Sequence, residues 1–418
     1  MTTVPTPNNA QRLTAKIAIG FFLLAAILGT LMRYIYLQEV PFLDYRNVLH
    51  AHSHTAMLGW GFTALAGALV FYLLPNMTNQ QVYRNALWGN LLAGVGMFFA
   101  FLYQGYGPVS IAFSTLHLLV AYYFSWHFLK DIKKLPPTNA VKFAKWAIYW
   151  MIFSTLGLWA IAPVSMLLGK LHPLYFASIQ FFLHLQFNGW FTYGILALLF
   201  NQSEVKGSAV QLPKGTFLIL QISLLLTYTL SITWSTPEDF LFYLNSTGVI
   251  LQIIAFFLLA KGFSKSTTFP FADRSLSGWL LQLGLLSLAL KVVVQGAVAL
   301  PFIAKVSYTI RNFVIGFIHL SMLGAFSLSL IALLLHRHLL PKTTMATMGY
   351  RLLTIGFILT EAMLFVQGIL LWAGKGFMPY YHSIIFVVTL LLPIALLLVF
   401  TTLFQTEKHH VSTGYKHE

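Results

Sequence analysis

Histidines are the residues of this chain with the clearest capacity for chemistry. The chain has fourteen of them. Those that lie inside long apolar stretches are His54, His117, His184, His319 and His382. An ionisable side chain inside a bilayer is costly and is by default a candidate functional residue. Histidine is also the commonest metal ligand and a usual axial ligand of haem iron. The functional question is therefore which of these histidines lie close enough together to bind one metal.

The elements that must position these histidines are membrane-spanning helices. The chain is 58% hydrophobic and 8% charged, with a mean hydropathy of +0.76, whereas soluble proteins have roughly 25% charged residues. One span needs about 20 apolar residues. The sequence predicts twelve spans, at about 14–36, 49–74, 85–106, 110–130, 143–168, 174–200, 215–235, 241–262, 276–299, 307–335, 350–373 and 381–405. We therefore expect an all-α polytopic protein in which residues 1–418 form one integral membrane domain, with polar tails at 1–13 and 406–418.

The net charge of +15 is explained by topology. Lys and Arg are far more frequent in the loops on the same side as the termini than in those on the opposite side. The positive-inside rule then predicts a protein of the inner, cytoplasmic membrane with both termini in the cytoplasm. The partner implied is membrane lipid, and no nucleic acid is implied. The chain has no cysteine, which excludes disulfides and thiolate ligands.

Three of the buried histidines form a group by position. In the predicted topology, His54, His184 and His319 lie on helices that enter the membrane from the outside. They lie in the outer half of the bilayer or near its middle, at comparable depths. Two imidazoles from facing helices can coordinate one haem iron from opposite sides, which leaves no open position and suits electron transfer. The alternative is that each histidine satisfies a hydrogen bond between helices.

These three helices resemble those of haem–copper oxidase large subunits, most closely the nitric oxide reductase branch. The segment HTAMLGWGFTALAGALVFYLLP starts at His54 and ends with Phe71, Tyr72 and Pro75 at the spacing of the family's second helix. The segment GFIHLSMLGAFS places His319 at the second histidine of the family's tenth-helix motif. The resemblance implies a subunit I-like bundle of twelve helices in which His54 and His319 ligate a low-spin haem b.

The same resemblance implies a degenerate catalytic centre. His184 in HLQFNGWF matches the histidine that binds the non-haem metal, and Asn188 stands where the reductases have Glu. Phe317 replaces the ligand of the high-spin haem, and Leu230 and Ser231 replace a histidine pair on the seventh helix. The resemblance therefore leaves enzymatic activity open. His184 is the candidate ligand of a second metal, Cu or Fe, and a hydrogen bond to a neighbouring side chain is the alternative.

Other polar residues have a functional and a structural interpretation. Arg46, Arg311 and Lys305 are candidate contacts of the haem propionates, or ordinary membrane anchors. His50 shares a helix face with His54 while His52 points elsewhere. His50 is therefore a candidate for a propionate or a metal at the outer surface, or simply part of a polar helix start.

Two charged residues fall within predicted spans. Lys291 and Glu361 are expected to pair with each other, which would offset the cost of burial. Such a pair would serve either proton transfer or structure.

Three functions compete at this point. The first is a membrane b-type cytochrome with one bis-His haem, for electron transfer or for a redox or gas response. The second is a divergent reductase of nitric oxide or oxygen with a rebuilt metal site. The third is a transporter without haem. The first two need a separate electron donor, a cytochrome c or a quinol, since the chain has no cysteine to attach a c-type haem.

Overall fold

The computed structural model describes residues 7–75, 80–266 and 274–413, and their regular secondary structure is helical throughout. The elements are α1 (Asn9–Ile35), α2 (Tyr45–His54), η1 (Thr55–Gly61), α3 (Phe62–Leu73), α4 (Gln80–Gln104), α5 (Pro108–Ile132), α6 (Asn139–Leu167), α7 (Pro173–Leu185), η2 (Gln186–Phe191), α8 (Thr192–Val205), α9 (Thr216–Thr227), η3 (Tyr228–Ile232), α10 (Asp239–Ser264), α11 (Leu276–Ala297), α12 (Pro301–Thr309), α13 (Arg311–His319), η5 (Leu320–Leu328), α14 (Ser329–His336), α15 (Thr344–Trp372) and α16 (Tyr381–Thr413).

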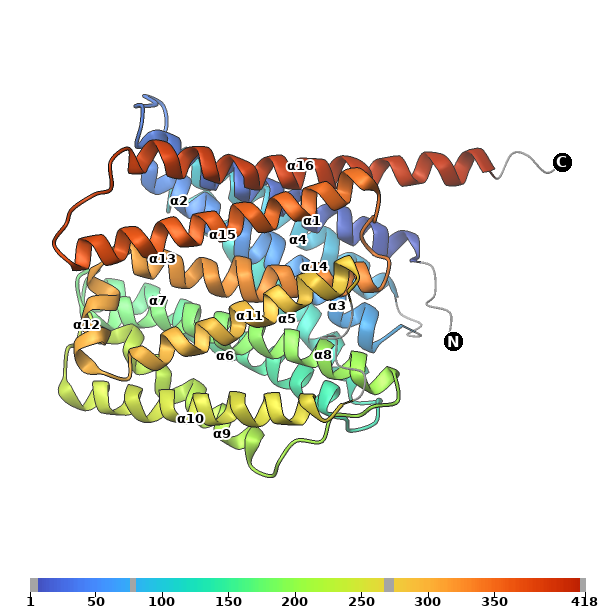
Figure 1. Ribbon diagram of the computed structural model, residues 1–418, viewed down its shortest axis with the longest axis horizontal. Helices are drawn as coiled ribbons and strands as arrows, with labels where there is room; N and C mark the ends of the chain where they lie inside the picture. The colour runs from blue at the N-terminus through green and yellow to red at the C-terminus, as the bar shows by residue number, and fades with distance from the viewer. Residues whose placement is uncertain (1–6, 76–79, 267–273, 414–418) are drawn as a thin grey trace.

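The chain is a multi-pass membrane protein. Ten helices of the described residues are long and apolar enough to cross a membrane: Asn9–Ile35, Tyr45–Leu73, Gln80–Gln104, Pro108–Ile132, Asn139–Leu167, Asp239–Ser264, Leu276–Ala297, Arg311–His336, Thr344–Trp372 and Tyr381–Gln405. They form a bundle in which the start of α1 and the end of α16 lie at the same end (Figure 1). The all-α polytopic fold is confirmed.

The other two expected spans are helical as well, but they differ from the ten. The segment Thr216–Ile232 is apolar but shorter. The segment from Pro173 to Val205 is one continuous helix through α7, η2 and α8, with polar residues at its centre. At the end of the chain, α16 continues to Thr413, so the region expected as a polar tail from 406 is helical in part.

Helix α2 begins earlier than its hydropathy predicts because it has a good N-cap. The Asp44 carboxylate accepts hydrogen bonds from the backbone amides of Arg46 and Asn47, at 2.8 and 3.0 Å. These bonds satisfy amides that have no partner within the helix. Arg46 therefore lies in the first turn of the helix and not in the loop before it.

Each of the three helices singled out by its histidine widens into a π-helical segment directly after it. His54 precedes η1, His184 lies one residue before the end of α7, and His319 precedes η5. Side-chain hydroxyls satisfy carbonyls inside the wide turns: Thr192 Oγ1 donates to the Phe187 carbonyl and Ser327 Oγ to the Met322 carbonyl, at 2.8 and 2.7 Å. Such π-segments occur frequently at functional sites.

The π-segments meet in the core of the bundle. The Trp60 indole in η1 donates to Ser327 Oγ in η5 at 2.9 Å and stacks on Phe22 of α1 with ring centroids 4.5 Å apart. Tyr72 Oη in α3 donates to the Leu333 carbonyl of α14 at 2.7 Å. These contacts hold α1, the α2–α3 helix and the α13–α14 helix against one another, so the helices that bear His52, His54 and His319 are neighbours.

Candidate functional site

His52 is held on α2 with one ring nitrogen free. Its Nδ1 lies 2.8 Å from the backbone carbonyl of Ala25 in α1. A carbonyl only accepts, so Nδ1 carries the proton and Nε2 keeps its lone pair for another partner. Gly29, one turn along α1, makes room for the ring, since a Cβ there would lie 3.2 Å from His52 Cε1. The local structure therefore fixes both the tautomer and the orientation of His52.

His319, at the end of α13, faces Glu361 of α15. The distance from His319 Nδ1 to Glu361 Oε1 is 3.9 Å, which is longer than a hydrogen bond. Within the described part of the chain, neither His319 Nδ1 nor either carboxylate oxygen has a hydrogen-bond partner. Buried polar atoms are normally paired, so this site has unused capacity to bind.

His52 on α2 lies within electrostatic range of His319 on α13. Both imidazoles are partly buried, and 31% of the His319 side chain is accessible. Two imidazoles from different helices with unused nitrogens are a donor set that fits haem iron.

Basic side chains lie near this pair at the end of the bundle opposite the start of α1. Arg33, in the last turn of α1, acts electrostatically on both His52 and His319. Arg311 opens α13 and contacts Tyr45, with a guanidinium nitrogen 3.5 Å from the phenol oxygen. Arg46, which the sequence also suggested for this role, acts electrostatically on His50.

His54 lies on the other side of α2. Its Nδ1 donates to the His50 carbonyl at 2.9 Å, and its ring packs on Phe101 of α4, with centroids 4.1 Å apart. His50 contacts the same Phe101 and also Tyr106. The expected shared face of His50 and His54 is confirmed. This face packs against α4, whereas His52 faces α1.

His117 has a structural role in this arrangement. Its Nδ1 donates to Asn90 Oδ1 at 2.6 Å, and Asn90 Nδ2 donates to the Leu58 carbonyl and to Thr63 Oγ1, at 3.1 and 2.9 Å. The Leu58 carbonyl belongs to the π-segment η1. The Asn90–His117 pair therefore ties α4 and α5 to the widened turn.

His184 is engaged at both ring nitrogens. Its Nε2 donates to the Leu224 carbonyl at 2.8 Å, and Asn188 Nδ2 lies 3.4 Å from its Nδ1. Neither nitrogen is free to bind a metal in this conformation. Among the described residues, no group of three or more His, Cys, Asp or Glu side chains could hold a metal ion.

The expected pairing of Lys291 with Glu361 is wrong. The ammonium of Lys291 donates to Asn188 Oδ1 at 2.5 Å, and Glu361 faces His319. Lys291 on α11 contacts the helix that bears His184, and Glu361 on α15 contacts the helix that bears His319. His382 also stays apart from the other histidines, stacked on Tyr36 with centroids 5.1 Å apart.

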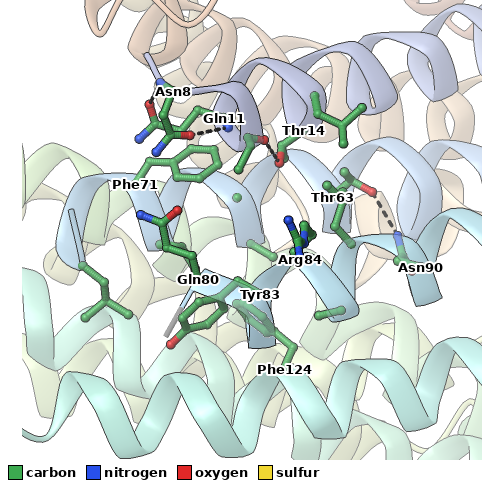
Figure 2. A pocket seen from close by; sticks show the side chains of 18 of the residues that line it. Asn8, Gln11, Thr14, Thr63, Phe71, Gln80, Tyr83, Arg84, Asn90 and Phe124 are labelled. Atoms are coloured by element: carbon green, nitrogen blue, oxygen red, sulfur yellow. Dashed lines mark hydrogen bonds between the residues drawn. The ribbon is translucent and has the colours of Figure 1, made fainter. Parts of the chain in front are cut away.

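A cavity lies near the start of α1, lined in part by Asn8 and Thr14 (Figure 2). Phe71, Tyr83 and Phe124 line it together with the polar side chains of Gln11 and Arg84 (Figure 2). It reaches Thr63 and Asn90 but none of the histidines. The cavity is therefore separate from the His52–His319 pair.

The sequence analysis did not propose His52 or Arg33 as site residues. The string HAHSH offers three histidines, and only the spacing to the later aromatic residues favoured His54. The signal that distinguishes His52 is a contact with α1, which no local pattern in α2 reveals.

No protein-family model and no curated protein matches this chain.

Proposed function

We propose that the chain is a membrane-embedded b-type cytochrome that holds one low-spin haem between His52 and His319. The observation that supports it is the placement of these two imidazoles on different helices within electrostatic range of each other, with His52 Nε2 free and His319 Nδ1 facing Glu361. We move the first ligand from His54 to His52 because His54 packs against Phe101, on the side of α2 that faces α4.

The residues around the pair have defined roles in this proposal. A haem with two imidazole ligands supplies one-electron transfer and has no open position for a gas. The Ala25 carbonyl orients His52, and Glu361 is placed to orient His319. Arg33 and Arg311 would hold the propionates, because guanidinium pairs with carboxylate through two parallel hydrogen bonds. His184 would be structural, since both its nitrogens have partners.

The wider proposal is a twelve-span bundle like haem–copper oxidase subunit I, in the inner membrane with both termini cytoplasmic. Two further segments would complete the twelve spans. They are the short apolar segment Thr216–Ile232 and the continuous helix Pro173–Val205, which has polar residues at its centre. The protein would pass electrons or respond to redox state. Its electron donor would be a separate cytochrome c or quinol.

The decisive experiment is a reduced-minus-oxidised optical spectrum of purified protein made with ample haem supply, followed by haem extraction and carbon monoxide. We expect one haem per chain, a sharp low-spin b-type band and no shift with carbon monoxide. A carbon monoxide shift would indicate an open iron and a divergent reductase. Colourless protein would overturn the proposal in favour of a transporter.

A further inference from the structure

Lys291 is a cation deep inside the bundle. It lies on α11 within the span Leu276–Ala297, and only 3% of its surface is exposed. Moving an unpaired charge from water to such a place costs several kcal/mol or more. A buried lysine therefore needs a partner that offsets this cost.

The protein provides Lys291 with a neutral partner only. Its ammonium donates to Asn188 Oδ1, and Asn188 Nδ2 in turn donates to the His184 carbonyl at 3.1 Å. Within the described ranges, no carboxylate forms an ion pair with Lys291. An ammonium has three N–H donors, and a single one of them has a hydrogen-bond partner among those residues.

A small cavity lies beside Lys291, between the widened helices. It has a volume of about 20 Å³, while a water-sized group needs about 10–15 Å³ on the same measure. Two of its walls are η2 and η5. The lining residues are Phe187, Phe191, Thr192, Ile195, Leu288, Lys291, Ser321, Met322, Ala325 and Phe326.

The lining determines what kind of ligand would fit. The hydroxyls of Thr192 and Ser321 already donate to backbone carbonyls, at 2.8 and 2.7 Å. Among the lining residues, Lys291 is therefore the one with N–H donors left unused. One positive charge and few donors suit a small monovalent anion. Sulfate or phosphate would need more donors and more space.

We propose that the cavity between η2, α11 and η5 binds one small inorganic monovalent anion, of the chloride or bromide kind, paired with Lys291. The anion would neutralise the buried ammonium and take the N–H donors that Asn188 leaves unused. This site is independent of haem binding, because it uses neither His52 nor His319. Protein without haem would still bind the anion.

The first test uses the full chain, purified in a chloride-free gluconate buffer. Gluconate is replaced by chloride at constant ionic strength while the thermal unfolding midpoint is recorded. We expect the midpoint to rise and then saturate, because an anion that binds the folded state stabilises it. In Lys291→Met, which keeps the apolar stem, apparent chloride affinity should fall at least roughly tenfold. Lys261→Met, at an exposed site on α10, should respond like the wild type.

The second test does not depend on a variant that folds. Crystals of the wild-type protein grown with bromide should show an anomalous peak in the cavity beside Lys291. Identical unfolding curves in chloride and gluconate for the wild type would overturn the proposal. An equal chloride response in Lys291→Met, or bromide crystals with no peak at that place, would also overturn it.

Discussion

His319 Nδ1 and Glu361 Oε1 lie 3.9 Å apart, and neither atom has a hydrogen-bond partner in the described part of the chain. The gap is about 1 Å longer than a usual N–H···O hydrogen bond. A small rotation of either side chain would close it. Partners of this kind fix the tautomer of a ligating histidine and raise its basicity. Glu361 is thus a positioning residue in the proposed haem site.

Substitution of Glu361 is predicted to change two separate quantities, the stability of the protein and the midpoint potential of its haem. Glu361→Leu removes two buried unpartnered oxygens, so we expect the haem-free protein to gain about 1–3 kcal/mol of unfolding free energy. The same variant should shift the haem midpoint potential, because His319 loses its acceptor. Glu361→Gln keeps one acceptor oxygen and should shift the potential less. Thermal unfolding and redox titration measure the two effects. Equal potentials in all three proteins would exclude this role.

The haem ligands are distinguished by three single substitutions. His52→Ala and His319→Ala should each lower haem content at least roughly tenfold, since loss of an outer-shell partner alone often costs 10–100-fold. His54→Ala should retain haem, because that ring packs on Phe101. Haem extracted per milligram of purified protein is the measurement. If His54→Ala loses haem while His52→Ala keeps it, the assignment favoured by the sequence pattern is restored.

Asn90 is predicted to be important for stability. It is 1% exposed and makes three hydrogen bonds, to His117, Thr63 and the Leu58 carbonyl. Asn90→Ala leaves these groups buried without partners, at a cost of about 1–3 kcal/mol for each group. Thermal unfolding in detergent should show a clear loss of stability. The matched control is Asn85→Ala, at an exposed site on the same helix, which should change stability by less than about 0.5 kcal/mol.

The proposed topology can be tested cleanly because the chain has no cysteine. Variants with one introduced cysteine each are expressed, and intact cells are labelled with a membrane-impermeant maleimide. Lys170→Cys and Lys375→Cys lie in loops expected outside, so both should label. Lys134→Cys and Lys206→Cys lie in loops expected inside and should label only after lysis. The reverse pattern would place the termini outside and contradict the positive-inside assignment.

The sequence by itself determined the fold class and the helices that matter. The chain is 58% hydrophobic and 8% charged, and its apolar runs are about 20 residues long, which indicates spanning helices. A helix satisfies its backbone hydrogen bonds within the segment, as a bilayer requires. Each histidine within a predicted span was a candidate functional residue because an ionisable side chain is costly inside a bilayer. These are one-dimensional properties, and they need no knowledge of which helices are neighbours.

Tertiary structure decided which polar groups meet. His52 and His54 are two residues apart, so they lie on nearly opposite sides of α2, and only the packing of α1 and α4 shows what each side contacts. Lys291 and Glu361 were expected to pair because both are buried charges, yet each contacts a different histidine helix. Partner choice depends on contacts between helices far apart in the chain, and the spacing of residues along one helix does not encode them.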